Sequence, residues 1–300
     1  MRNETLSSIL PLVETHNIFV LLGDLGVHQC RDLFANYPLN ITNYGIMEQS
    51  MVGVSAGLSS TGMYPVLYSI TPFLIDRAYE QIKLDLVYNK NPCLIISAGA
   101  AYDYSKLGPT HYCPHDISAL LLVGFPYILI PFVAEEAISA LSYCVYNRYL
   151  SYLRLSSSSL DFSLYPWLTL VQEAGRTQHL PLKHWISSLS TNKALVVFSP
   201  DAQFLPVYDE LLNEKIDVVQ VCEISRESLS NLSTTLESYT ELEIMVPFES
   251  STLVEHLQIC LSHRSNKLTI HTISNQYLDA SMTKESIFAK LYVYYSFGLI

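Results

Sequence analysis

One acidic residue, Glu48, stands alone in residues 43–75, a stretch that carries no other charged side chain before Asp76. Apolar side chains recur around it at helical spacing and predict a helix with one buried face, at Met47, Met51, Val54 and Leu58. A carboxyl group at such a helix start is subject to two opposed effects, because the helix dipole favours its ionised form and desolvation favours its protonated form. It is therefore suited to share a proton with a buried basic nitrogen, and the alternative is a carboxylate that only caps the helix.

The elements that would position this carboxyl group alternate along the first half of the chain. Strands are predicted at residues 18–22, 64–70, 93–98, 127–130 and 152–155, and helices near 30–36, at 46–60 and 73–89, and on either side of the strand at 127–130. Such alternation predicts a parallel sheet covered by helices on both faces. We assign it to a first domain over residues 1–156.

A second alternating series follows after residues 157–191, which contain several serines with Pro166 and Pro181 and are predicted to connect two domains. Its strands are predicted at residues 194–199, 217–222, 243–247 and 267–272, with helices between them and a last helix from about Lys284. The predicted fold class is therefore α/β, with two domains that each hold a mostly parallel sheet covered by helices. The second domain is expected over residues 192–300.

Composition narrows the possible partners. The formal net charge is −11 and no cluster of Lys and Arg is present, which argues against nucleic acid or an anionic membrane surface as a partner. The uncharged residues 117–134 reach the length of a spanning helix, but Gly124, Pro126 and Pro131 interrupt them, so we expect a buried strand between two helices instead. Six separated cysteines without a CxxC pair and an N-terminus without an apolar signal core predict a cytoplasmic protein.

Four segments carry a resemblance to a known family. The run NYGIMEQSMVGVSAGL at residues 43–58 resembles the central motif of the pyrimidine-binding domain in the transketolase family, and Glu48 falls on the catalytic Glu of that motif. Further along, in the family's order, YSITPFLIDRAYEQ at 68–81 resembles its aromatic segment, GPTH at 108–111 its histidine loop, and YLRLS at 152–156 the strand whose Arg binds substrate phosphate. More distantly, the chain is similar to deoxyxylulose-phosphate synthases.

The resemblance implies thiamine diphosphate as the cofactor. In such enzymes a carboxyl group bonded to the pyrimidine ring nitrogen drives the 4-amino group to its imino tautomer, which then removes the thiazolium proton. Glu48 would have this role and Phe73 would stack on the aminopyrimidine, with Tyr68 and Tyr79 completing an aromatic box and Ile46 touching the cofactor. Ordinary core packing is the alternative for the aromatic residues, of which the chain has many.

The same resemblance suggests roles for His111 and Arg154. His111 follows a Gly-Pro turn, where an imidazole can bond the cofactor or move a substrate proton. Arg154, near the carboxyl end of a strand, would hold substrate phosphate, and an ion pair with an acid is the alternative.

Other residues near these positions have further expected roles. His115 is expected to cap a helix, and Asp76 and Arg77 to form local ion pairs. With Cys113, the two loop histidines also suggest zinc but lack the fourth ligand of a closed site. The loop departs from transketolases at Leu107, where the family has Asp, and Lys106 could offer a substitute charge.

The motif that holds the cofactor diphosphate in transketolases is not found in this sequence. It consists of GDG followed by Asn, which binds Mg²⁺, and this chain has GDLG at residues 23–26 instead. The resemblance therefore implies one chain of a split transketolase, with the Mg²⁺ ligands on a separate subunit and an α2β2 assembly. The reaction would transfer a two-carbon ketol unit between sugar phosphates. The alternatives are the beta subunit of a 2-oxoacid dehydrogenase decarboxylase component and a non-catalytic assembly or regulatory subunit.

Overall fold

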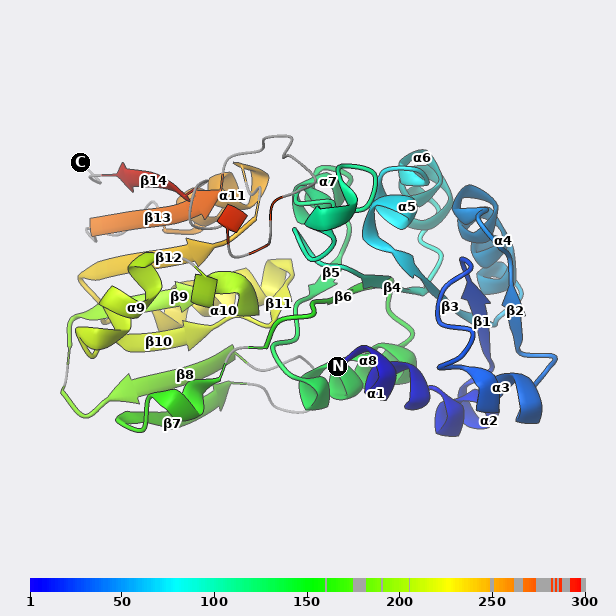
Figure 1. The fold of residues 1–300 in the computed structure, drawn as a ribbon, viewed down its shortest axis with the longest axis horizontal. Helices are drawn as coiled ribbons and strands as arrows, with labels where there is room; N and C mark the ends of the chain where they lie inside the picture. Colours follow the sequence, from blue (N-terminus) through cyan, green and yellow to red (C-terminus); the bar gives the residue numbers. More distant parts are fainter. Residues whose placement is uncertain are drawn as a thin grey trace.

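The computed structural model of the 300-residue chain describes residues 1–159, 161–174, 182–189, 191–204, 206–248, 251–261, 267–273 and 292–297, with Met282, Lys284, Ser286 and Ile287. These residues form two sheets that lie side by side, each flanked by helices (Figure 1). The predicted α/β class with two mostly parallel sheets is confirmed.

The first sheet has the strand order β11-β5-β6-β4-β3-β1-β2. Its strands are β1 (Ile18–Leu22), β2 (Ile41–Asn43), β3 (Tyr64–Ile70), β4 (Leu94–Ala98), β5 (Tyr127–Leu129), β6 (Ser151–Leu155) and β11 (Glu223–Ile224). All neighbours pair in parallel except β11, which runs antiparallel to β5. The central strands β3, β4 and β6 are buried along almost their whole length, as expected of a parallel sheet covered on both faces.

Helices lie on both sides of this sheet. One side carries α1 (Arg2–Ser7), α2 (Val13–His16), α3 (Arg31–Asn36) and α8 (Ala134–Asn147), and the other carries α4 (Glu48–Ser60), α5 (Thr71–Ile75), α6 (Tyr79–Gln81) and α7 (Asp116–Leu122) (Figure 1). The uncharged residues 117–134 divide into most of α7, the strand β5 and the start of α8, as their Gly and Pro residues predict. None of the described helices is long and apolar enough to cross a bilayer.

The helix predicted over residues 73–89 is not continuous. The chain forms α5, then α6, and then a wider π-helical turn at Ile82–Tyr88. Pro72 starts α5 in its first turn, where the missing N–H costs nothing. The break after α5 gives Asp76 and Arg77 different directions from those that a continuous helix would impose.

The second sheet has the strand order β14-β13-β12-β9-β10-β8-β7. Its strands are β7 (Leu168–Ala174), β8 (Leu182–Ser187), β9 (Lys193–Val197), β10 (Asp217–Gln220), β12 (Glu241–Val246), β13 (Lys267–Ile273) and β14 (Tyr292–Phe297), and its helices are α9 (Pro206–Asn213), α10 (Arg226–Thr235) and α11 (Ser251–Leu261). The four predicted strands form its parallel centre, while β7, β8 and β14 join it antiparallel.

Residues 157–191 therefore do more than connect two domains, because they supply two strands of the second sheet. The two halves also share structure, since β11 comes from the second half and completes the first sheet beside β5. In addition, α11 packs against α7. Lys284 and Ser286–Ile287 are helical, at the start of the predicted last helix. That helix does not continue to the end of the chain, because Tyr292–Phe297 form the strand β14.

Candidate functional site

Glu48 is the first residue of α4, and it is completely buried. Both oxygens of its carboxyl group accept hydrogen bonds from side chains distant in the sequence. The Ser69 hydroxyl donates to Oε1 at 3.0 Å, and the Arg77 guanidinium donates to Oε2 at 2.5 Å. One oxygen is thus held by a neutral hydroxyl at the end of β3, and the other by a cation whose side chain is 38% exposed.

A glycine allows this carboxyl group to lie so close to the sheet. A Cβ placed on Gly23, directly after β1, would lie 2.7 Å from Ser69 Oγ and 3.2 Å from Glu48 Oε1. Both distances are shorter than ordinary van der Waals contact, so a side chain here would displace the groups that hold Glu48. The first glycine of the GDLG turn therefore makes room for Glu48 and Ser69.

The loop that leads into α4 is fixed by a pair of side chains. Asn43, the last residue of β2, accepts hydrogen bonds from the backbone N–H of Asp24 at 3.0 Å and of Gly45 at 3.1 Å. Its amide nitrogen also donates to Asp24 Oδ1 at 3.1 Å. The loops after β1 and β2 are thereby tied together, and they direct the start of α4 over the carboxyl ends of the parallel strands, where ligands bind in such sheets.

Arg77 connects the buried carboxyl group to two of the predicted site residues. Its guanidinium lies over the Phe73 ring at 4.4 Å from the centroid, and the Phe73 ring lies edge-on to the His111 ring at 5.3 Å. Phe73 and His111 are both half-buried. The structure thus brings Glu48, Phe73 and His111 into one chain of contacts, with Arg77 between them.

The other predicted cofactor contacts lie elsewhere. Side chains on a strand alternate between faces, so Tyr68 points to the face opposite its neighbour Ser69, where its ring lies against Gly26 and where Leu6 of α1 also lies close. Tyr68 is fully buried there, away from Glu48. Tyr79 donates its hydroxyl to the Ala119 carbonyl at 3.2 Å and packs between helices. Ile46 is 68% exposed just before α4, and Met47 beside it is 54% exposed.

Arg154 forms the ion pair that its alternative interpretation predicts. Its guanidinium donates to Asp116 Oδ2 at 2.7 Å and to Oδ1 at 3.2 Å, and both side chains are 0% exposed. The Tyr152 hydroxyl donates to the same carboxylate at 2.7 Å. Although burial alone would lower the pKa of Arg154, the negative charge of Asp116 raises that pKa above its ordinary value. The assignment of Arg154 to substrate phosphate is corrected accordingly, because the contacts leave its side chain no access to solvent.

The pairing of Asp76 and Arg77 also differs from the expectation of local ion pairs. Arg77 reaches Glu48, and Asp76 accepts a bond from His115 Nε2 at 2.8 Å. His115 precedes α7 but makes no side-chain cap there. The motifs in the sequence did not identify Ser69 or Arg77 as partners of Glu48. Helical spacing gives no signal for Arg77, because α5 ends at Ile75 and Arg77 lies in the turn after it.

The arrangement can hold a carboxylate ready for a basic nitrogen. Ser69 fixes Oε1 from inside the sheet, so only Oε2 is directed toward the half-exposed side chains. A ligand nitrogen that took the place of Arg77 would meet Oε2 beside the flat Phe73 ring. The residues present therefore fit an aromatic nitrogen heterocycle of the kind that thiamine diphosphate carries.

Comparison with known proteins places this site in a family. Residues 12–161 match the family model described as "Transketolase, pyrimidine binding domain". That range contains Glu48, Phe73, Arg77 and His111, and it corresponds to the half of the chain that forms the first sheet.

Two curated relatives and one solved structure are similar to the chain. A "33.6 kDa protein in fasciation locus" of Rhodococcoides fascians is 35% identical over 138 residues, which are 46% of this chain and 44% of that protein. A subunit of the apulose-4-phosphate transketolase of Actinobacillus succinogenes is 33% identical over 124 residues, which are 41% of this chain and 40% of that protein. The matches thus span less than half of the relatives' own length. A structure titled "Split gene transketolase, inactive beta4 tetramer" has the same fold, with a TM-score of 0.73 and 19% identity over 97% of this chain and 92% of that one.

Proposed function

Since this chain belongs to the family of transketolase pyrimidine-binding domains, we propose that it is the pyrimidine-binding subunit of a two-chain, thiamine-diphosphate-dependent transketolase. The reaction would transfer a two-carbon ketol unit from a ketose phosphate to an aldose. The observation that carries the proposal is the buried carboxyl group of Glu48, held at Oε1 by Ser69 and covered at Oε2 by a residue that is itself partly exposed.

Each side chain of the site has a distinct proposed role. Glu48 would exchange a proton with the ring nitrogen of the aminopyrimidine through Oε2, while Ser69 keeps the carboxyl plane in place. Phe73 would stack on the ring and fix its distance from Glu48. His111, edge-on to Phe73, would move a proton to or from the substrate oxygen. The cofactor itself would supply the carbanion that carries the two-carbon unit.

Arg77 would have to leave Oε2 before the ring nitrogen could approach it. The guanidinium is 38% exposed, so it can turn toward solvent, while its contact with the Phe73 ring would be replaced by the cofactor ring. In the absence of cofactor, the bond from Arg77 keeps a buried negative charge compensated. Arg77 is therefore a positioning residue for the apo site in this proposal.

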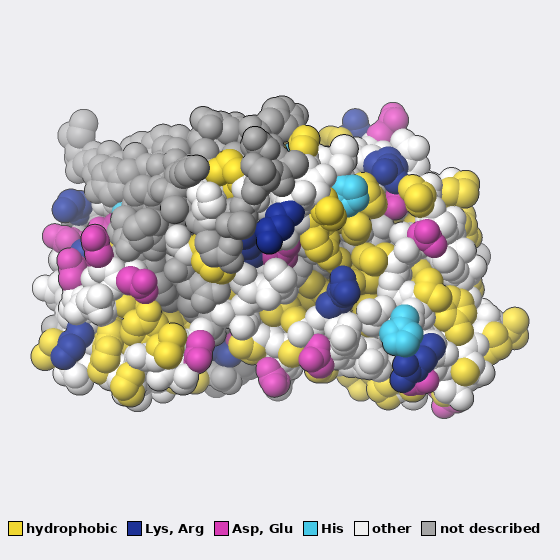
Figure 2. Space-filling view, viewed as in Figure 1, with side chains coloured by type: hydrophobic (Ala, Val, Ile, Leu, Met, Phe, Trp, Pro, Cys, Tyr) yellow, Lys and Arg dark blue, Asp and Glu magenta, His cyan; other side chains and the backbone are white. Residues whose placement is uncertain are grey.

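A second chain is part of the proposal. The name of the relative from Actinobacillus succinogenes describes one subunit of a transketolase, and the sequence lacks the GDG motif that binds Mg²⁺ and diphosphate in transketolases. Exposed apolar side chains adjoin the Glu48 segment and the histidine loop, at Val27, Ile46, Met47 and Leu107. Figure 2 shows hydrophobic side chains on the surface of both halves of the molecule, including the half that the first sheet forms. We expect the partner chain to cover such side chains and to complete the cofactor site.

The proposal is tested with the purified chain and a candidate partner chain that bears GDG and Asn. Titration calorimetry should show weak binding of thiamine diphosphate with Mg²⁺ to this chain alone and much tighter binding to the mixture. Ketol transfer should then be measurable in the mixture only. Tight binding to this chain alone, or no transfer with any such partner, would contradict the two-chain proposal.

Glu48→Gln tests the catalytic role within that mixture. The amide keeps the shape of the carboxyl group but cannot take up the proton, so turnover should fall by about 100- to 10,000-fold. Glu80→Gln is the matched control, because Glu80 is an exposed acid on α6. The control should keep full turnover, and an active Glu48→Gln enzyme would exclude Glu48 from the mechanism.

A further inference from the structure

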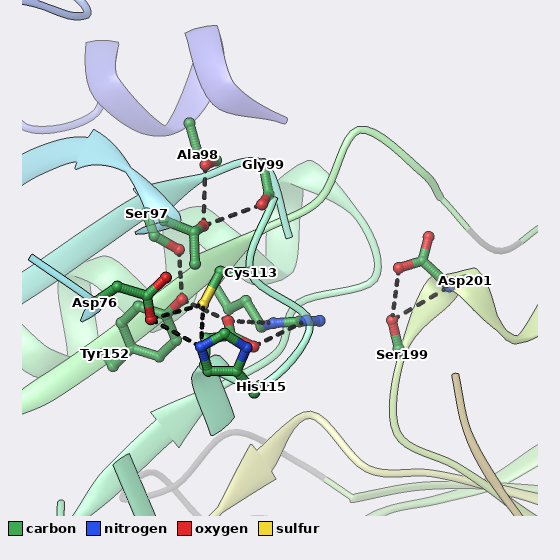
Figure 3. Close-up of polar contacts among 12 residues, drawn as sticks. Asp76, Ser97, Ala98, Gly99, Cys113, His115, Tyr152, Ser199 and Asp201 are labelled. Carbon is green, nitrogen blue, oxygen red and sulfur yellow. Dashed lines mark hydrogen bonds and ion pairs between the residues drawn. The ribbon is translucent and has the colours of Figure 1, made fainter. Parts of the chain in front are cut away.

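A second cluster lies beside the site and is not used by the proposed reaction. Asp76 follows α5, and Cys113 and His115 come from the loop between His111 and α7. Figure 3 shows the three side chains converging on one point. Within the described part of the chain, they form the one group of His, Cys and acidic residues whose ligand atoms lie close enough to hold a metal ion.

The distances among the three ligand atoms match those of a tetrahedral metal centre. Cys113 Sγ lies 3.6 Å from Asp76 Oδ1 and 3.7 Å from His115 Nε2, and the latter two atoms are 2.8 Å apart. Bonds of about 2.0–2.3 Å to zinc place neighbouring ligands about 3.3–3.8 Å apart. Two of the three edges already have this length, and the third requires only that the His115–Asp76 contact open by about 0.5 Å.

The donor set and its surroundings select the type of ion. One thiol, one imidazole and one carboxylate suit Zn²⁺, whereas Mg²⁺ and Ca²⁺ require oxygen ligands. The Asp76 side chain is 44% exposed and that of His115 is 38% exposed, so water can occupy the fourth position. Cys113 is fully buried, and its N–H bonds the Ala101 carbonyl at 3.3 Å, which holds the loop in place.

We propose that Asp76, Cys113 and His115 form a zinc site with three protein ligands and one water. On binding, the Cys113 thiol loses its proton to solvent and the resulting thiolate coordinates the ion. His115 coordinates through Nε2, and Asp76 through Oδ1. This zinc site does not depend on the cofactor proposed above. The chain should bind zinc even without its partner chain.

The ion would join two segments that carry the proposed catalytic residues. Asp76 lies next to Arg77 and three residues after Phe73, while Cys113 lies two residues after His111. A zinc bridge would therefore fasten the histidine loop to the end of α5. Its occupancy would add a metal link to the edge-on ring contact between Phe73 and His111 and to the His115–Asp76 bond, which already hold the two segments together.

Metal binding is measured on the full-length chain after removal of metal with a chelator. Zn²⁺ titrated alone should bind with one equivalent per chain, excess Mg²⁺ should not compete, and Zn²⁺ should raise the midpoint of thermal unfolding. Co²⁺ in place of Zn²⁺ should give the visible bands of a tetrahedral site together with thiolate charge-transfer absorption. This last readout needs no variant, and its absence at saturating Co²⁺ would overturn the proposal.

Two variants assign the ligands. Changes outside the first coordination shell alone weaken metal binding by about 10- to 100-fold, so Cys113→Ser should weaken Zn²⁺ binding by about 100-fold or more and abolish the thiolate absorption. Asp76→Asn should weaken binding while the thiolate absorption of any bound Co²⁺ remains. Cys260→Ser is the matched control, because Cys260 is a partly exposed cysteine on α11 in the other half of the chain. Zinc affinity that survives in Cys113→Ser, or that is lost equally in Cys260→Ser, would contradict the site.

Discussion

The first sheet holds two buried acids at helix starts, each paired with an arginine, and the two pairs differ in access to solvent. Asp116 at the start of α7 and Arg154 are both 0% exposed. Glu48 at the start of α4 is equally buried, but its partner Arg77 is 38% exposed. A pair that is sealed on both sides can only hold the fold together, whereas a pair that is open on one side can exchange its cation for a ligand.

Breaking the sealed pair, Asp116 with Arg154, should have the largest effect on stability. Arg154→Met leaves the Asp116 carboxylate buried with no cation, so the free energy of unfolding should fall by about 3–5 kcal/mol. Urea unfolding followed by circular dichroism measures this loss. The double variant Asp116→Leu with Arg154→Met should recover much of it, because no charge then remains buried.

Arg31→Met is the control for this measurement. Arg31 pairs with Asp32, and these two side chains are 66% and 70% exposed. The change in unfolding free energy should lie within about 0.5 kcal/mol. A comparable loss from Arg154→Met would mean that the sealed pair contributes no more than a surface one.

Gly23→Ala tests how tightly the open pair, Glu48 with Arg77, is packed against the first sheet. The new methyl group would meet Ser69 Oγ at 2.7 Å and Glu48 Oε1 at 3.2 Å, and such overpacking should cost about 1–3 kcal/mol in urea unfolding. Gly57→Ala is the matched control, because nothing lies within 4 Å of the added Cβ in the interior of α4. The control should increase stability by about 0.5–1 kcal/mol, since alanine favours a helix. Equal effects of the two changes would show that Gly23 is not confined.

Arg77→Met breaks the open pair itself and should cost less than Arg154→Met. Water can reach the vacated side of Glu48 Oε2, so we expect a loss of about 1 kcal/mol in the free energy of unfolding. The comparison is decided by measuring both variants in the same urea series. A loss from Arg77→Met as large as that from Arg154→Met would show that the Glu48 site is sealed as well.

The smallest effect is expected in the second sheet, where His184 on β8 bonds the Tyr239 hydroxyl at 2.7 Å. Burial lowers the pKa of His184 below its ordinary value of 6.5, despite the nearby negative charge of Asp217. The unfolded chain therefore takes up a proton more readily, and the stability contributed by neutral His184 is present above pH 6.5 and lost as pH falls through the lower folded-state pKa.

Replacing His184 with glutamine should remove this pH dependence. Thermal unfolding between about pH 7 and pH 5 should show a smaller decline for His184→Gln than for the unchanged chain. His256→Gln, on an exposed residue of α11, is the control and should leave the decline unaltered. Parallel curves for the unchanged chain and His184→Gln would contradict the prediction.

Much of this architecture follows from local patterns in the sequence. The patterns of β1, β3, β4 and β6 correctly predict strands of the first sheet, and a helix follows Glu48 as predicted, because both depend on neighbours along the chain. The buried face predicted for that helix is wrong, since Met47 is 54% and Val54 is 37% exposed while Val52 and Ser55 are buried. The prediction of residues 157–191 as a connection is incomplete, because their serines and prolines conceal two strands, β7 and β8, which pair with each other and attach to the second sheet through β10. The strand β14, which pairs antiparallel with β13, lies where the sequence predicts part of a last helix.

The site shows the same division between local and distant information. Glu48, Phe73 and His111 were identified from motifs, and the structure brings them together. Strand alternation could have excluded Tyr68, because Ser69 and Tyr68 face opposite sides of β3. The partners of Glu48 and Arg154 depend on contacts 29 and 38 residues apart in the chain, which no local pattern records.

The two-residue strand β11 has a consequence for any attempt to dissect the molecule. Cutting the chain after the last strand of the family-matched half would strip β5 of its antiparallel neighbour and leave a row of unpaired backbone amides and carbonyls. An exposed strand edge of this kind can pair with a strand of another chain, so the isolated fragment should self-associate. The length of chain that folds independently is thus greater than the length that carries the family motif.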